Sequence, residues 1–510
     1  MLDNILYGFS VAFQPANLFF AFLGVLIGTV AGVLPGIGAA ASIALLLPIT
    51  FGMDPVVAII MVAGVYYGSM YGGSTTSILL NVPGEAASVV TALDGYQMAR
   101  KGRAGAALGM CAFASFIAGT IGVVLLTFLA PALSKVALSF GPPEYTVLLA
   151  IGLLCASILA SGSRIKSLMM VVTGLLLGVV GIDPITGAQR FTFGTIYLLD
   201  GLGLVVVVMG LFGISQVLMM IDEGEGEGGV FPVTSRLREL LPNREEWRAS
   251  WAPLTRGSFL GFLLGLLPGG GAVLASFMAY AVEKKLSRHP ERFGTGAIEG
   301  VASSEGANNS ATAGAMVPLL TLGIPFNVIT GLMLAALMIH GIRPGPLLIS
   351  AHPEIFWGVI ASMYVGNLML LVLNLPLVGL FVQLLKVPHR VMWPLIVLVT
   401  VVGSYSVNHN SWDVFLMIAV GIVGYALRKA DFELAPLVLA LILGLQLETS
   451  FRQSLVASHG SLATFVTRPL AAGMLAALAA VLLAVAAWRI WKRSSRKRSS
   501  TPISPSSRTW

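Results

Sequence analysis

The sequence predicts an all-α protein that crosses a membrane about 11 to 12 times, in two repeats with broken helices and hairpins. Three observations predict this fold. Of the 510 residues, 56% are apolar and only 10% are Asp, Glu, Lys or Arg, against roughly 25% charged residues in soluble domains. Long intervals without any charge recur along the chain. A segment rich in glycine, with one proline, occurs in the first half and again in the second.

The charge-free intervals predict where the membrane spans lie. A helix needs about 20 apolar residues to cross the hydrocarbon core of a bilayer. One interval of at least this length runs from Asp3 to Asp54, and another runs from Glu305 to Arg343. These intervals are longer than the strands of a membrane barrel and lack their polar alternation. The spans are therefore predicted to be helices.

Two segments indicate an internal duplication. Residues 24–39 read GVLIGTVAGVLPGIGA, and residues 257–272 read GSFLGFLLGLLPGGGA. Small residues at every fourth position also predict closely packed helices. At a constant offset of 233, eight positions are identical: Gly24, Gly28, Gly32, Leu34, Pro35, Gly36, Gly38 and Ala39 recur as Gly257, Gly261, Gly265, Leu267, Pro268, Gly269, Gly271 and Ala272.

A second pair of segments follows the first, but its register is open. Residues 71–85 read YGGSTTSILLNVPGE, and residues 305–327 read EGANNSATAGAMVPLLTLGIPFN. Matching the two Ser-x-Thr pairs gives an offset of 236. Matching the Val-Pro of residues 82–83 with the Ile-Pro of residues 324–325 gives an offset of 242. The sequence supports either alignment.

The chain is predicted to divide at a charged segment. Residues 1–221 form the first membrane repeat, residues 222–256 an extramembrane linker, residues 257–488 the second repeat, and residues 489–510 a tail. The tail holds seven basic residues and no acidic residue. A basic segment directly after an apolar span predicts a cytoplasmic C-terminus by the positive-inside rule.

The positive charges also predict that the two repeats have inverted topology. After the first Pro-Gly segment, the turn at residues 51–54 has no basic residue. After the second, four basic side chains cluster within residues 284–292. Corresponding turns are thus expected on opposite sides of the membrane, as inverted repeats require.

The Pro-Gly segments are expected to break their helices, because proline lacks an N–H group and glycine loosens the backbone. Broken helices leave free peptide groups, which persist in a membrane only where they are buried in protein or line a wet cavity. Two matched breaks predict a substrate cavity near the midplane. The residues expected to shape it are Pro35, Gly36, Gly38, Pro83, Pro268, Gly269, Gly270, Gly271 and Pro325.

Polar residues without charge are candidates for binding the substrate. Free N–H groups at the start of a half-helix favour an anion such as a carboxylate, and hydroxyl, amide and carbonyl oxygens can coordinate Na⁺. No pattern of soft metal ligands occurs, so neither a metal site nor a tightly bound cofactor is expected. The predicted substrate-binding residues are Gly73, Ser74, Thr75, Thr76, Ser77, Asn308, Asn309, Ser310 and Thr312.

Several further residues near these segments have two interpretations. An acid inside a membrane is costly and usually functional, but each acid here could instead lie at an interface or pair with a base. The tyrosines could line the cavity or form an interfacial belt. The acids are Glu85, Asp94, Glu299 and Glu305, and the tyrosines are Tyr66, Tyr67 and Tyr71.

Composition leaves few classes of function. The dipeptide Gly-Lys is absent, so the chain has no phosphate-binding loop of an ATPase. A channel remains an alternative, although channels usually need pore-lining rings from oligomers. A membrane enzyme would need paired acids, a nucleophile with its base, or a metal set, and none is evident. A purely structural subunit would not account for two broken repeats.

At these motifs the chain resembles the large permease subunit of the tripartite tricarboxylate transporters, the TctA family. The resemblance covers roughly residues 17–480. It rests on Gly32–Ala39, Tyr66–Glu85, Asp94–Tyr96 with Ala99–Gly105, Gly265–Ser276 and Glu299–Pro325. Phe326 departs from the family pattern, in which glycine usually follows the Ile-Pro pair.

The resemblance implies a multi-pass protein of the bacterial inner membrane that takes up small organic carboxylates. It implies two protein partners, a small four-span membrane subunit (TctB-like) and a periplasmic solute-binding protein (TctC-like). It also implies coupling to a gradient of Na⁺ or H⁺. Lipid is the expected surrounding, and no nucleic acid is expected as a partner.

Overall fold

The computed structural model describes residues 1–34, 37–159, 163–223, 237–269, 271–384, 389–480 and 482–483. In these ranges the chain is helical apart from one small antiparallel hairpin, in which β1 (Gly181–Ile182) pairs with β2 (Gln189–Arg190). The predicted all-α fold is therefore confirmed. The basic tail predicted at residues 489–510 lies outside the described ranges.

The helices divide at the linker. Before it lie α1 (Leu2–Ala12), α2 (Pro15–Val33), α3 (Gly38–Thr50), α4 (Pro55–Leu80), η1 (Ala86–Ser88), α5 (Val89–Arg100), α6 (Ala104–Ala137), α7 (Pro142–Leu159), α8 (Arg164–Gly178), η2 (Ile196–Leu198), α9 (Leu204–Val208), η3 (Met209–Ile214) and α10 (Ser215–Glu223). After it lie α11 (Leu237–Leu240), α12 (Arg244–Gly265), α13 (Gly271–Leu286), η4 (Pro290–Arg292), α14 (Ile298–Leu322), α15 (Val328–Ile339), α16 (Leu348–Ala351), α17 (Pro353–Asn374), α18 (Val378–Leu384), α19 (His389–Asn408), α20 (Ser411–Lys429), α21 (Ala435–Ala457) and α22 (Thr464–Thr467).

Many of these helices are apolar enough for a membrane. Among the described residues, seven are long enough to cross it and five more apolar helices are shorter, which agrees with a polytopic membrane protein, although fewer helices qualify as full spans than the roughly 11 to 12 predicted. Helix α14 is too polar to be counted among them. Yet every residue of α14 except Glu299 is buried, so other helices shield its polar side chains from lipid.

The chain forms two compact units. The larger contains Met1–Ser139 and Gly152–Leu445, and the smaller contains Phe140–Ile151 and the chain from Gln446 onward. Within the smaller unit, the Arg468 guanidinium pairs with Glu144 at 2.7 Å. The larger unit holds both Pro-Gly segments and all the residues of the candidate site.

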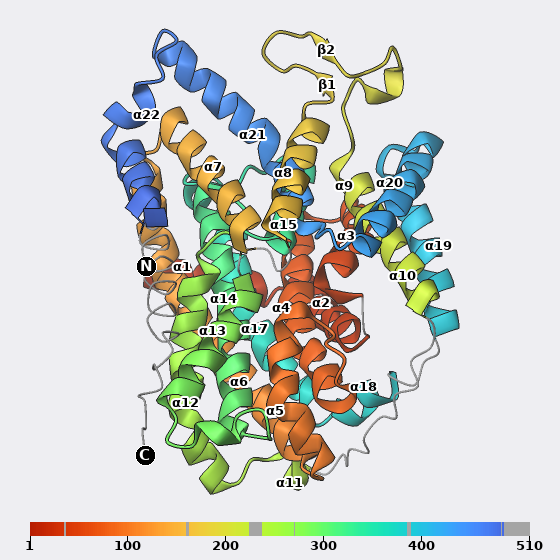
Figure 1. Ribbon diagram of the computed structural model, residues 1–510, viewed down its shortest axis with the longest axis vertical. Coiled ribbons are helices and arrows are strands. Elements are labelled where there is room, and N and C mark those ends of the chain that lie inside the picture. Colours follow the sequence, from red (N-terminus) through yellow and green to blue (C-terminus); the bar gives the residue numbers. More distant parts are fainter. Residues whose placement is uncertain are drawn as a thin grey trace, which may run out of the picture. The chain divides into compact units, whose positions relative to one another are not determined.

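Both predicted helix breaks are present in the larger unit. Helix α2 ends at Val33 and α3 begins at Gly38. Helix α12 ends at Gly265 and α13 begins at Gly271. The two starting glycines have positive φ angles of 61° and 39°, a conformation that residues with a β-carbon rarely adopt. In Figure 1, α2 and α3 are drawn in red and orange, and α12 and α13 are drawn in green.

Glycines pack the long helix of each break against the next long helix. Gly24, Gly28 and Gly32 of α2 face the backbone of α4 at Met61, Val65 and Ser69. Gly257, Gly261 and Gly265 of α12 face the backbone of α14 at Ser303, Ala307 and Ala311. Without side chains at these positions, the helix backbones come into direct contact. The glycines differ by the offset of 233, and their partners differ by 242.

These contacts settle the register that the sequence left open. Helix α4 corresponds to α14 at an offset of 242, so the Ser-x-Thr pairs of the two helices are not equivalent. The return contacts agree, because Gly72 faces Thr29 while Gly314 faces Phe262. Equivalent residues also end the two helices in the left-handed conformation, Asn81 with φ 59° and Gly323 with φ 71°.

The two equivalent helices run antiparallel where they meet. Ser74 of α4 contacts Glu305 of α14. Seven residues earlier in α4, Tyr67 lines a small pocket with Asn309 and Thr312, which lie further along α14. Antiparallel equivalents are what an inverted repeat requires, so this geometry supports the inverted topology predicted from the charges.

Part of the predicted linker is helical. Helix α11 and the first part of α12 lie inside residues 222–256, and residues 224–236 lie outside the described ranges. Asn243 and Glu246 cap α12 reciprocally. Arg103 pairs with Glu246, and Phe113 contacts Trp247 edge to face. The second half of the linker is therefore packed against the start of α6.

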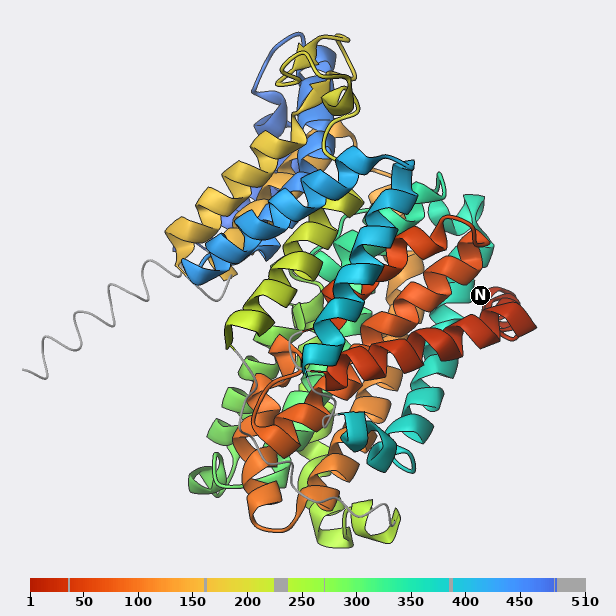
Figure 2. The same ribbon diagram turned by 90° about the vertical axis from the view of Figure 1, so that its right-hand side faces the viewer.

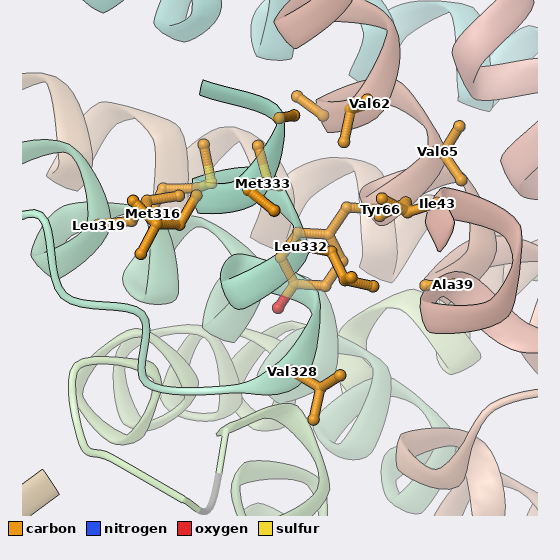
Figure 3. Packing of buried hydrophobic residues seen from close by; sticks show 14 of the residues in the cluster. Ala39, Ile43, Val62, Val65, Tyr66, Met316, Leu319, Val328, Leu332 and Met333 are labelled. Atoms are coloured by element: carbon orange, nitrogen blue, oxygen red, sulfur yellow. The ribbon is translucent and has the colours of Figure 1, made fainter. Parts of the chain in front are cut away.

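A large hydrophobic core joins the repeats. Figure 3 shows Tyr66 of α4 beside Leu332 of α15, with Ala39 and Ile43 of α3 nearby in the same cluster. Figure 2 shows α19 and α20 beside α10, and these helices contact one another. The core thus places the start of α3, the middle of α4 and the start of α15 in one region of the larger unit.

The glycine packing predicts a stability defect from added volume. A β-carbon on Gly28 would lie 2.5 Å from the Val65 carbonyl oxygen. Overpacking of this kind costs about 1–3 kcal/mol, so Gly28→Val should lower the melting temperature of the purified protein in detergent. By the repeat, Gly261→Val should behave alike. Gly52→Val is the control, because nothing lies within 4 Å of that position. Equal melting temperatures for all three would contradict the assigned helix contacts.

Candidate functional site

The two repeats present equivalent tips after α4 and α14. After Asn81 and Gly323, the left-handed residues that end these helices, a short loop leads to the next helix. That helix starts with a capping box, in which two side chains each bond to the backbone N–H of the other residue. Glu85 and Ser88 form the cap of the first tip, and Asn327 and Thr330 form that of the second. The offset of 242 relates both pairs, so Asn327 is the counterpart of Glu85.

The first tip places a carboxylate at a helix start. Glu85 accepts a hydrogen bond from the N–H of Ala39, the second residue of α3. A β-carbon on Gly38 would lie 3.0 Å from the same carboxylate, and one on Gly73 would lie 2.9 Å from the Glu85 side chain. The N-terminus of a helix favours an anion. In the first repeat the protein itself supplies a carboxyl group at this position.

The second tip places a neutral amide at the equivalent helix start. A β-carbon on Gly271 would lie 3.7 Å from Asn327 Nδ2. The same nitrogen donates to the Tyr66 hydroxyl at 3.3 Å, and Asn327 Oδ1 accepts from the N–H of Thr330 at 2.8 Å. Among the described residues, no carboxylate is bonded to the first N–H groups of α13. Among the described residues, the second repeat thus has a neutral amide where the first repeat has a carboxyl group.

The predicted cavity-shaping residues are distributed over both tips and both breaks. Gly38 and Gly271 begin the half-helices, and Gly269 donates its N–H to the Phe326 carbonyl at 2.9 Å. Pro83 is exposed, whereas Pro325 is buried and Pro268 is half-buried. Pro35, Gly36 and Gly270 lie outside the described residues.

The predicted serine and threonine cluster of α4 is buried and bonded within the protein. Ser74 donates to Glu305 at 2.6 Å. Thr76 donates at 2.6 Å to the carbonyl of Val33, the last residue of α2, and so satisfies an orphan group at the break. Ser77 reaches Ser88 Oγ at 2.8 Å. Thr75 is also buried.

The predicted polar cluster of α14 is less fully bonded. Asn309 Nδ2 donates to Ser115 Oγ at 2.7 Å, and Thr312 donates to the Asn309 carbonyl at 2.6 Å. Asn308 and Ser310 are buried, and neither side chain has a hydrogen-bond partner among the described residues. Unpaired polar groups this deep are rare in native proteins, which makes α14 a candidate element of the site.

Four helices meet at one buried acid. Glu305 is fully buried, and it accepts from Ser74 of α4, from Thr91 of α5 and, at 3.1 Å, from Ser115 of α6. Asn309 Nδ2 lies 3.5 Å from its second oxygen. We call these five residues the Glu305 cluster. Two predicted binding residues, Ser74 and Asn309, therefore meet through an acid.

The tyrosines are internal rather than interfacial. Tyr66, Tyr67 and Tyr71 are all buried. The Tyr71 hydroxyl donates to Asn367 Oδ1 at 2.6 Å, and Tyr67 lines the small pocket that also contains Asn309, Thr312 and Asn367. Of the two interpretations left open by the sequence, the structure supports the internal one.

The remaining acids have structural partners. Asp94 Oδ1 accepts from the N–H groups of Gly294, Gly296 and Ala297 at 2.7–2.8 Å. Its other oxygen accepts from the Tyr280 hydroxyl at 2.8 Å. Glu299 lies 3.9 Å from Arg292. Asp94 therefore holds the loop before α14, and Glu299 lies at the first turn of that helix.

Sequence reasoning missed four polar residues of this region. Thr91, Ser115 and Asn367 lie in segments that were not compared between the repeats, and each acts across helices far apart in sequence. Asn327 could have been found, because it stands two residues after Pro325 as Glu85 stands two residues after Pro83. That match requires the offset of 242.

Comparisons with known proteins agree with this architecture. Residues 18–439 match the tripartite tricarboxylate transporter TctA family. The chain is 50% identical over 487 residues to an uncharacterized 52.8 kDa protein in the TAR-I ttuC' 3' region of Agrobacterium vitis, covering 95% of this chain and 96% of the relative. It is also 50% identical over 226 residues to an uncharacterized protein in the TAR-II ttuC' 3' region of the same organism, covering 44% of this chain and 93% of the relative. The chain is therefore a multi-pass membrane protein that belongs to the TctA family of tripartite tricarboxylate transporters.

Proposed function

We infer that the chain is the permease subunit of a secondary transporter that takes up small organic carboxylates, using a cation gradient. It works in a bacterial inner membrane with a small four-span subunit and a periplasmic binding protein that delivers the substrate. The family match supports the transport role. The matched helix breaks support a carrier mechanism, because secondary transporters bind substrates at such breaks and expose them alternately to each side.

One observation carries the choice of substrate class. The first repeat keeps a carboxylate, Glu85, at the N-terminus of its half-helix. The second repeat has Asn327 at the equivalent position. A half-helix start that holds an internal carboxylate in one repeat offers the same N–H geometry to an external carboxylate in the other. We place one carboxylate group of the substrate at the start of α13.

The groups around this position suit an anion. The Asn327 amide and the Tyr66 hydroxyl supply neutral donors. The start of α13 supplies the free N–H groups and the positive end of the helix dipole. In this arrangement the segments Gly73–Ser77 and Asn308–Thr312 form the walls between the two tips. Substrate release needs donors that bind without a permanent ion pair, and all of these donors are neutral.

Uptake by the reconstituted complex tests the function. Proteoliposomes containing this chain and its small membrane partner should accumulate ¹⁴C-labelled citrate or succinate when the binding protein and an inward cation gradient are present. Uptake should saturate and should stop without the binding protein. Current that does not saturate with concentration, and that does not need the binding protein, would instead indicate a channel.

Asn327→Asp tests the position of the substrate carboxylate. The variant recreates the Glu85 arrangement in the second repeat, so an internal anion should compete with the substrate and lower uptake at least about tenfold, corresponding to roughly 1.4 kcal/mol of lost binding. Aspartate caps a helix as well as asparagine does, so folding should persist. The matched control is Asn410→Asp, at the N-cap of α20. Unchanged uptake by Asn327→Asp would remove the start of α13 from the site.

A further inference from the structure

Glu305 is buried without a compensating charge. None of its surface is exposed, and no lysine, arginine or histidine in the described part of the chain forms an ion pair with it. Moving a carboxylate out of water without a cationic partner is costly. The free-energy cost of burying Glu305 therefore depends strongly on whether its carboxyl group carries a proton.

The hydrogen-bond partners of Glu305 suit both protonation states. Ser74, Thr91 and Ser115 contact it through hydroxyl groups, and a hydroxyl can rotate to donate or to accept. An ionised Glu305 accepts from all three. A protonated Glu305 donates to one of them, which then turns its own proton elsewhere. Neither state leaves the buried carboxyl group without partners.

Asp94 provides the contrast within the same structure. One of its oxygens accepts from three backbone N–H groups. Backbone N–H groups cannot accept a hydrogen bond, so towards them this oxygen can act only as an acceptor. Asp94 therefore faces donors, three of which cannot accept a hydrogen bond, whereas Glu305 faces hydroxyl groups that can either donate or accept.

The hydroxyl oxygens around Glu305 are joined to it by direct hydrogen bonds. Ser74 Oγ lies 2.6 Å from Glu305 Oε1, and Ser115 Oγ lies 3.1 Å from Oε2. These are direct hydrogen bonds. In each of these bonds a hydroxyl hydrogen lies between the two oxygens, so a proton can be exchanged along a hydrogen bond that already exists. A proton needs no additional space.

The other ionisable groups near α14 do not neutralise Glu305. Those that interact with it are Tyr71 of α4 and Cys111 of α6, and neither is a cation. Several other ionisable side chains on or beside the helices around α14 have partners of their own. Asp94 of α5 bonds to Tyr280 of α13, Arg256 of α12 pairs with Glu283 of α13, and Glu85 bonds to Ala39.

The cluster also links the two repeats. Ser74 belongs to α4 of the first repeat, and Glu305 belongs to its equivalent α14 in the second. Alternating access moves one repeat or bundle against the other. Such movement changes the number of hydroxyl groups that face the carboxyl group, and therefore changes its affinity for a proton.

We propose that Glu305 takes up and releases the coupling proton, so that the transporter is a carboxylate–proton symporter. This proposal rests on the proposed function. On one side of the membrane a proton from water forms an O–H bond with a carboxylate oxygen of Glu305. After the repeats have moved, that bond breaks and the proton passes to water on the other side.

Glu305→Gln separates coupling from transport. Glutamine resembles the protonated acid but cannot exchange a proton. Without Na⁺, a pH gradient of one unit should drive up to about tenfold accumulation of labelled citrate or succinate per proton in wild-type proteoliposomes, with acidification of an internal dye. Glu305→Gln should lose both the accumulation and the acidification, while exchange of internal for external substrate continues. Glu299→Gln, on the same helix, should retain all three activities.

Two results would overturn the proposal. One is accumulation by Glu305→Gln that still follows the pH gradient. The other is wild-type accumulation driven only by Na⁺ without acidification.

If wild-type protein transports neither substrate, the proposed function fails, and infrared difference spectra in detergent still test the role of Glu305. In the wild type, raising the pH should remove the carbonyl band of a protonated carboxylic acid. The same band should be present in Glu299→Gln and missing from Glu305→Gln. Absence of that band from the wild type would refute proton exchange at Glu305.

Discussion

The close approach of glycine faces to neighbouring helix backbones is the contact on which the rest of this structure depends. Gly24, Gly28 and Gly32 let α2 lie directly on α4, and their counterparts let α12 lie directly on α14. Lipid supplies little hydrophobic driving force between helices, so packing at this distance provides the cohesion. It also fixes the helix register. That register decides which residues reach each tip and which meet at Glu305.

Much of the fold could be predicted from the sequence, because it is encoded in patterns that are local or repeated. The charge-free intervals indicated the spans, and the Pro-Gly segments indicated the breaks at Val33–Gly38 and Gly265–Gly271. The register of α4 against α14 could not be predicted. Each of the two possible alignments rests on a match of only two residues. The chance match of the Ser-x-Thr pairs therefore looks as good as the true match of Val-Pro with Ile-Pro. Only the three-dimensional contacts distinguish them.

The site was predictable as a region but not as a set of partners. The polar segments of α4 and α14 were recognised, yet Ser74 and Asn309 meet through Glu305, more than two hundred residues from Ser74 in the chain. Thr91 and Ser115 join them from α5 and α6, and single hydroxyl groups carry no sequence signal of such a role. Duplication explains the breaks, whereas the divergence at Glu85 and Asn327 is the basis of the proposed substrate position. The informative positions are those at which the two halves differ.

The two tips have the same backbone form but opposite surroundings. Val82 of the first tip is 45% exposed, whereas its counterpart Ile324 is fully buried. Both loops follow a left-handed residue and end in a reciprocal cap, so their own folding does not create this difference. The neighbouring helices do. A rigid-body displacement of those neighbours could therefore uncover one tip and enclose the other without unwinding any helix, and such asymmetry between related halves is the geometric basis of a gate that faces one compartment at a time.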